Sequence, residues 1–155
     1  MREEVIGALG HIGDESSIEF LSGVLLISDP KFRRLAAQAL GETKSPNAVQ
    51  SLIRGLGDGD GKVREAIAEA LIQIGQPTVE PLISAMKSKG ELVRRQVVKI
   101  LVQIGLPAIE PLRNLLKGKN IEPRVQVLEE QTLRQILKEG GRNERRDERG
   151  VTKRG

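Results

Sequence analysis

The chain repeats itself with a period of 30 to 31 residues, and this period constrains its fold more than any other feature. Arginine marks each unit at intervals of 31, 31, 30 and 30 residues: Arg2, Arg33, Arg64, Arg94 and Arg124. A leucine stands seven residues after each of the first four arginines: Leu9, Leu40, Leu71 and Leu101. Two independent positions with one period predict a row of similar structural units.

Apolar residues within a unit are spaced as on one face of an α-helix. Val49, Leu52 and Leu56 follow an i, i+3, i+7 pattern, which differs from the alternation of a β-strand. Glycines stand where the first helix of a unit should end: Gly13, Gly75 and Gly105. Asp14 and Ser45 have the side chains of N-caps for second helices. Each unit is therefore predicted to be a pair of helices.

One helical pair cannot bury its apolar stripe alone, so we expect the pairs to stack. The predicted fold is all-α, an α-solenoid of about four and a half two-helix repeats over residues 1–137. The fifth unit has only one helix, with Gln131 where leucine is expected, and this indicates a C-terminal cap with polar residues turned outward. Helix starts near Asp29 and Asp60 place the equivalent start before Met1, which suggests a shortened first helix or a longer array.

The segment at residues 8–13 reads ALGHIG, and a second helix opens with VEPL at residues 79–82. On these motifs residues 1–137 resemble the short HEAT repeats of the phycobilisome-lyase type, which implies an armadillo/HEAT-like superhelix. The resemblance implies several possible functions, because similar proteins include bilin lyase subunits, the di-iron deoxyhypusine hydroxylase, DNA glycosylases with a related superhelix, and scaffolds that bind other proteins.

The composition argues against most of these chemistries. The chain has no Cys and one His, so disulfides and thiolate sites are excluded and imidazole ligands are scarce. A hydroxylase-like centre needs repeated His-Glu pairs for two irons, whereas His11 is followed by Ile12. Two Phe without Trp or Tyr make a poor pocket for a flipped base. A lyase-like subunit stays open, but we expect no enzyme and no cofactor.

Two sets of polar residues suit structural roles better than catalysis. The positions equivalent to His11 in the later units are also polar, which indicates a solvent-exposed row rather than a triad: Glu42, Gln73 and Gln103. The arginines of the second and third units each follow an aspartate by four residues: Asp29 and Asp60. We expect these arginines to pair with those acids or with their neighbours in adjacent repeats, instead of binding phosphate.

The outward side of the second helices is the candidate binding surface, because these helices line the concave wall in the family that the chain resembles. The helical wheel places Ile53 and Ile83 at the border of the buried stripe, and half-exposed aliphatics beside a polar rim suit a protein partner. The helix dipole alone also favours the charges found there. The predicted partner-binding residues are Glu19, Gln50, Ile53, Arg54, Glu80, Ile83, Ser84, Lys87, Glu110, Arg113 and Asn114.

Most of the net charge of +4 lies at the C-terminal end. Residues 1–137 hold 18 Lys and Arg against 17 Asp and Glu, a net +1, while residues 138–155 hold 7 against 4, a net +3. These last residues lack periodicity and predict a disordered tail beyond a helix stop at Gly140. Nucleic acid is expected to bind only through this tail. The sequence has no secretory signal and no long apolar run, so we expect a cytoplasmic protein without membrane contact.

Overall fold

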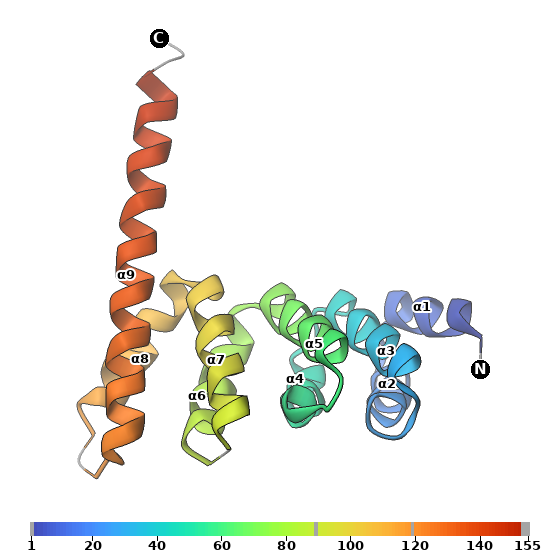
Figure 1. Ribbon diagram of the computed structural model, residues 1–155. Coiled ribbons are helices and arrows are strands. Elements are labelled where there is room, and N and C mark those ends of the chain that lie inside the picture. Colours follow the sequence, from blue (N-terminus) through green and yellow to red (C-terminus); the bar gives the residue numbers. More distant parts are fainter. Residues whose placement is uncertain (1, 89, 119, 153–155) are drawn as a thin grey trace.

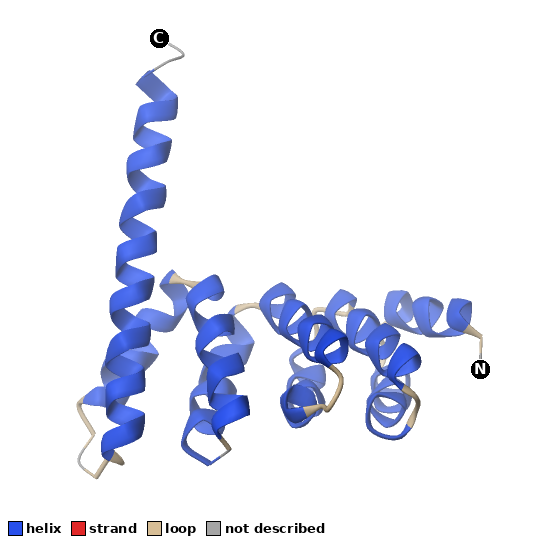
Figure 2. Cartoon of the chain, in the orientation of Figure 1, coloured by secondary structure: helices blue, strands red, loops and turns tan. Residues whose placement is uncertain are grey.

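The computed structural model describes residues 2–88, 90–118 and 120–152, and all regular structure within these ranges is helical (Figure 1, Figure 2). Side chains are described for residues 2–87, 90–118 and 120–140. The α-helices are α1 (Glu3–Ile12), α2 (Glu15–Ile27), α3 (Pro30–Glu42), α4 (Val49–Arg54), α5 (Gly61–Ile74), α6 (Val79–Ser88), α7 (Glu91–Ile104), α8 (Ile109–Leu116) and α9 (Pro123–Thr152). Single 3-10 turns are η1 (Pro46–Ala48), η2 (Gly55–Gly57), η3 (Gln76–Thr78) and η4 (Leu106–Ala108).

The α-helices form two rows, one of the first helices and one of the second helices of the repeat units. The first helices of the pairs, α1, α3, α5 and α7, contact one another in that order, and α9 packs on α7. The second helices α2, α4, α6 and α8 make a parallel series of contacts. Figure 1 shows α2 beside α3, α4 beside α5, α6 beside α7 and α8 beside α9, in that order along the array. The predicted α-solenoid is confirmed.

The helix ends follow the turn chemistry that the sequence predicts. Gly13, Gly75 and Gly105 have φ angles of +61°, +78° and +76°, values that favour glycine because it lacks a Cβ atom. Asp14 caps α2 by accepting a hydrogen bond from the Ser17 N–H at 2.8 Å. Ser45 accepts one from the Asn47 N–H at 3.2 Å before η1. The predicted boundaries between the helices are therefore confirmed at these positions.

The repeated leucines form the centre of the core. Leu40, Leu71 and Leu101 are fully buried, and so are the leucines of the second helices: Leu52, Leu82 and Leu112. Leu9 is only partly buried, because it belongs to the pair at the end of the row. Burying one such side chain contributes roughly 1.5–3 kcal/mol. A pair by itself would leave much of this surface in water.

Two glycines allow neighbouring first helices to approach closely. A Cβ atom placed on Gly41 of α3 would lie 2.8 Å from the Cα of Ala70 in α5. A Cβ atom on Gly10 of α1 would lie 3.0 Å from the Cα of Ala39 in α3. These distances are too short for any side chain, so the helix spacing depends on the missing Cβ atoms.

The final helix packs in a different register from the other first helices. Its buried side consists of Val125, Glu129, Thr132 and Ile136. The predicted exposure of Gln131 is confirmed, and Val127, whose equivalents in the three preceding units are buried, is 54% exposed. Because Gln131 is polar where the other units have leucine, turning α9 toward Val125 and Ile136 buries more apolar surface.

The backbone of α9 continues past the predicted helix stop. The helix passes through Gly140 without a break and ends at Thr152, so the stop expected at this glycine is wrong. Glycine weakens a helix interior by only about 1 kcal/mol relative to alanine and does not by itself end a helix. Residues 153–155 lie outside the described ranges. The division between residues 1–137 and a tail at 138–155 stays a prediction.

Gly41→Ala is expected to destabilise the protein by about 1–3 kcal/mol, because its Cβ atom would collide with the backbone of α5. Urea denaturation followed by circular dichroism measures the change in the free energy of unfolding. Gly7→Ala is the control: no atom lies within 4 Å of the added Cβ in α1, so helix propensity should stabilise that variant by roughly 0.5–1 kcal/mol. Equal effects of both substitutions would contradict the close-packing account.

Candidate functional site: the outward side of the second helices

The second helices expose polar side chains to solvent, and α2 also exposes Phe20, Leu26 and Ile27. We call the surface of these polar side chains the second-helix face. Nine of the eleven predicted partner-binding residues are exposed, and they define the face: Glu19, Gln50, Arg54, Glu80, Ser84, Lys87, Glu110, Arg113 and Asn114. They come from α2, α4, α6 and α8, so the face runs along the whole row of pairs. The structure therefore shows these nine residues as exposed, and their role as one binding surface stays a prediction.

The expected half-exposure of the two isoleucines is wrong. Ile53 is 5% exposed and Ile83 is 4% exposed. Both lie at the border of the apolar stripe, on helices that pack against the next second helix: α4 contacts α6, and α6 contacts α8. A helical wheel treats each helix in isolation and does not include contacts between neighbouring helices. The two isoleucines are core residues of the solenoid.

Charges on the second-helix face are sorted along the helices. Glu80 and Glu110 are the second residues of α6 and α8, whereas Arg54 ends α4 and Lys87 lies near the end of α6. This polarity agrees with the helix dipole, which favours acids at N-termini and bases at C-termini. Glu110 and Arg113 form an exposed ion pair at 3.1 Å. The face therefore combines an acidic margin with a basic one.

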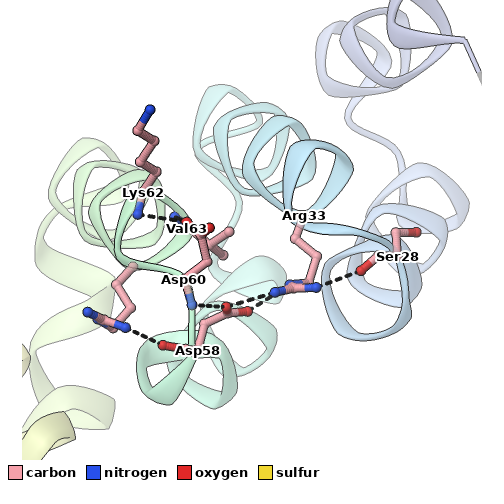
Figure 3. A network of polar contacts seen from close by, with 7 residues as sticks. Ser28, Arg33, Asp58, Asp60, Lys62 and Val63 are labelled. Atoms are coloured by element: carbon pink, nitrogen blue, oxygen red, sulfur yellow. Dashed lines mark hydrogen bonds and ion pairs between the residues drawn. The ribbon is translucent and has the colours of Figure 1, made fainter.

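Three arginines of the repeated series donate hydrogen bonds to backbone carbonyl groups at the C-terminal ends of second helices. Arg33 donates two hydrogen bonds to the Asp58 carboxylate, at 2.8 and 2.9 Å, and a third to the Ser28 carbonyl oxygen at 2.7 Å (Figure 3). Arg64 donates to the Asp58 carbonyl oxygen at 2.5 Å, and Arg94 donates to the Met86 carbonyl oxygen at 3.1 Å. The carbonyl groups at helix C-termini are thus satisfied by guanidinium groups.

Arg33 and Asp58 connect the two helices of one pair, since Arg33 lies in α3 and Asp58 follows η2 at the end of α4. Burial raises the pKa of the Asp58 carboxyl, but hydrogen bonds from Arg33 and from the Asp60 N–H outweigh this effect and lower the pKa below its usual value. The predicted pairing of Arg33 with an acid is confirmed, but the acid is Asp58 at the end of the same repeat rather than Asp29, Asp60 or a residue of an adjacent repeat. These contacts occupy Arg33 in a structural role.

His11 belongs to the exposed polar row that the repeat predicts. Its Nδ1 lies 3.3 Å from Oε2 of Glu42, the equivalent residue of the next unit. Gln73 and Gln103 are exposed as well. Asp14 serves as an N-cap and does not orient the imidazole. Among the described residues, no group of three or more His, Cys, Asp or Glu side chains is placed to hold a metal ion.

Glu129 is a buried carboxyl that the sequence analysis missed. It is 0% exposed, and both carboxylate oxygens lack a hydrogen-bond partner. Burial raises its pKa from 4.5 to about 7, and the charge of Lys87 only partly opposes this. The signal was present in the sequence, because Val125, Glu129, Thr132 and Ile136 share one helix stripe. Aligning α9 with the first helices of the other repeats predicts a different buried stripe, one that leaves Glu129 out.

Comparison with known proteins identifies the repeat type. The sequence model of the family described as HEAT repeats matches this chain twice, over residues 1–72 and over residues 55–134. No curated protein matches the chain. A crystal structure of an engineered protein from the Northeast Structural Genomics Consortium is 23% identical, covers 88% of this chain and 68% of its own, and has a TM-score of 0.42. A second engineered protein from that consortium is 22% identical, covers 88% and 41%, and has a TM-score of 0.43.

Every helix in the described part of the chain is too short or too polar to span a bilayer.

Glu129 should make the stability of the protein depend on pH. Because its folded-state pKa is raised, the folded protein holds a proton that the unfolded chain releases above its own pKa of 4.5. The free energy of unfolding should therefore fall as pH rises from about 4.5 to about 7, by up to the order of 3 kcal/mol. Urea denaturation at several pH values measures this.

The variant Glu129→Gln should lose most of this pH dependence and exceed the wild type in stability at about pH 8, since its side chain stays neutral. Glu130→Gln, one residue along the same helix and partly exposed, should keep the wild-type profile. A wild-type profile that is flat between pH 5 and pH 8, or a Glu130→Gln variant that flattens it equally, would contradict the assignment.

Proposed function

Because the chain belongs to the HEAT-repeat family, we propose that it is a non-catalytic scaffold that binds a protein partner through the second-helix face. The observation that carries the proposal is the continuous exposure of nine polar and charged side chains on four successive second helices. Solenoids use such extended surfaces for recognition, because every repeat adds one helix to the same side.

The charges of the face favour a partner with both signs of charge. Glu80 and Glu110 at the helix starts would attract basic groups, and Arg54 and Lys87 at the helix ends would attract acidic groups. A uniform phosphate backbone would be repelled by the acidic margin. An extended protein segment with separate basic and acidic groups fits both margins at once.

The finer assignments made from the sequence remain part of this proposal. The repeat length of 30 to 31 residues and the ALGHIG turn support the phycobilisome-lyase type of HEAT repeat, in which the second helices line the concave wall. A subunit of a lyase-like or deoxyhypusine-hydroxylase-like enzyme is the alternative. Bound tetrapyrrole colour or stoichiometric iron in the purified protein would favour that alternative over a scaffold.

A second alternative is weak nucleic-acid binding through residues 138–155, which carry a net charge of +3. Counterion release makes this kind of binding sensitive to salt. Retention on RNA or DNA that is salt-sensitive and disappears when these residues are removed would favour this alternative. It would also support the proposed division of the chain into a repeat domain and a basic tail.

Reversing two charges on the face should weaken binding of the partner. Affinity purification with the wild-type protein identifies the partner, and isothermal titration calorimetry then measures its dissociation constant. The double variant Arg54→Glu, Lys87→Glu should weaken binding by at least about tenfold, because two contacts of about 1 kcal/mol each become repulsive. Ile53 and Ile83 are unsuitable for this test, since substituting these core residues would unfold the solenoid.

The control applies the same change of charge to the first helices. Lys62 and Lys99 are exposed on α5 and α7, so the double variant Lys62→Glu, Lys99→Glu should bind like the wild type. Circular dichroism confirms that both double variants are folded. Equal loss of binding in both, or full binding by the variant on the second-helix face, would refute the assigned surface.

A further inference from the structure

The packing between neighbouring first helices changes along the array. In α1, α3 and α5 the helices approach each other through small residues: Gly10 lies against Ala39, and Gly41 lies against Ala70. α5 and α7 are in contact along a smaller part of their lengths than α3 and α5 are. Figure 1 shows α3 and α5 side by side, whereas α7 is tilted relative to α5. The close packing of the first three units therefore does not continue into the fourth.

The sequence explains the change, because larger residues replace the small ones at this junction. Ile72 of α5 stands at the repeat position that Gly41 occupies in α3. Ile100 of α7 stands at the position that Ala70 occupies in α5. The distance between two packed helices depends on the side chains at their contact, and two isoleucines need more room than a glycine and an alanine. The junction between α5 and α7 is therefore wider than the junction between α3 and α5.

Side-chain burial shows the same difference. Ala37 of α3 is 0% exposed, whereas Ala68, an alanine at the same repeat position of α5, is only half-buried. Likewise, Gly41 is buried and Ile72 is half-buried. Because residues 37 and 68 are both alanine, the side chain itself cannot cause their difference. It comes from the position of the helix that follows.

A groove of about 230 Å³ lies between α5 and α7 at this junction. Its apolar lining includes Ala68, Ile72 and Ile100. Three exposed charged residues also line it: Glu65 and Glu69 from α5, and Lys99 from α7. Among the described side chains, none of these three forms an ion pair across the groove. The width of the groove is therefore not fixed by polar contacts between its walls.

The opposite side of the junction keeps its packing. α4 contacts α6, and α7 contacts η2. Leu52 of α4 and Leu82 of α6 are fully buried. The chain passes from α5 to α6 through Gly75, whose φ angle is +78°, and the short turn η3. Apolar contact on one side of the junction and an open groove on the other are the arrangement of a hinge.

We propose that the array flexes at the junction between α5 and α7. Helices α1–α5 move as one closely packed block and α6–α9 as a second block, and the contact between α4 and α6 is the pivot. Closing is limited by Ile72 and Ile100, which meet in the groove, and opening is limited by the apolar surface that it exposes to water. The motion changes the angle between the parts of the second-helix face on α2–α4 and on α6–α8, and so changes its curvature.

Matched pairs of spin labels test this hinge, because the chain has no native cysteine. Four exposed residues at one repeat position serve as labelling sites: His11, Glu42, Gln73 and Gln103. The pair His11→Cys, Gln73→Cys spans the α1–α3 and α3–α5 junctions, and the pair Glu42→Cys, Gln103→Cys spans α3–α5 and α5–α7. Double electron–electron resonance should give a distance distribution roughly twofold broader for the second pair, because only that pair spans the loosely packed junction. Equal widths, or a broader distribution for the first pair, would overturn the proposal.

Restoring small residues at the junction should reduce the flexing. The double substitution Ile72→Ala, Ile100→Ala lets α7 approach α5, so the Glu42→Cys, Gln103→Cys distribution should narrow and its mean should shorten. The pair His11→Cys, Gln73→Cys in the same background is the control and should not change. Because Ile100 is buried, circular dichroism first establishes that this variant is folded, and the comparison of the two label pairs in the otherwise unchanged chain does not depend on it. A folded variant with an unchanged distribution for the second pair would overturn the role of the two isoleucines.

Discussion

Every helical pair of this chain has more apolar surface than its two helices can cover, and stacking of the pairs is the interaction on which the structure depends. The close approach of first helices at Gly10 and Gly41 sets the spacing of the row. At that spacing the repeated leucines lose all contact with water. The bidentate contact of Arg33 with Asp58 then connects the two helices of one pair, and Arg64 and Arg94 donate hydrogen bonds to carbonyl groups at the end of the preceding pair. Polar contacts refine an arrangement that apolar burial has already determined.

The same dependence explains why identical repeat positions have different roles along the row. Ile53 and Ile83 are core residues because a further second helix follows each of them. Val5 and Ile12 occupy positions that are covered in α5, yet in α1 they are exposed. Position in the array, and not residue type, decides which aliphatic side chains can contact a partner. The nine residues of the second-helix face are polar or charged, whereas the first two helices, α1 and α2, also expose large apolar side chains.

The C-terminal helix α9 buries a different side from the one that the first helices of the other repeats bury. Gln131 replaces the core leucine, and α9 turns to bury Val125 and Ile136 instead. This rotation also carries Glu129 into the interior, where its carboxylate has no hydrogen-bond partner. A protonated carboxyl reduces the cost of that burial, which makes the cap the pH-sensitive part of the fold. The net charge follows the same division, since residues 1–137 are nearly neutral and residues 138–155 hold most of the excess.

The sequence by itself determined the period, the helical pairs, the turn residues and the identity of the central leucines, because these depend on spacing along one helix and on local backbone chemistry. It also determined that the positions equivalent to His11 form a polar row. Only the tertiary structure decided the burial of Ile53 and Ile83, the choice of Asp58 as the partner of Arg33, and the register of α9. Each of these depends on which neighbouring helix covers a given side chain, and the periodicity of a single helix does not contain that information.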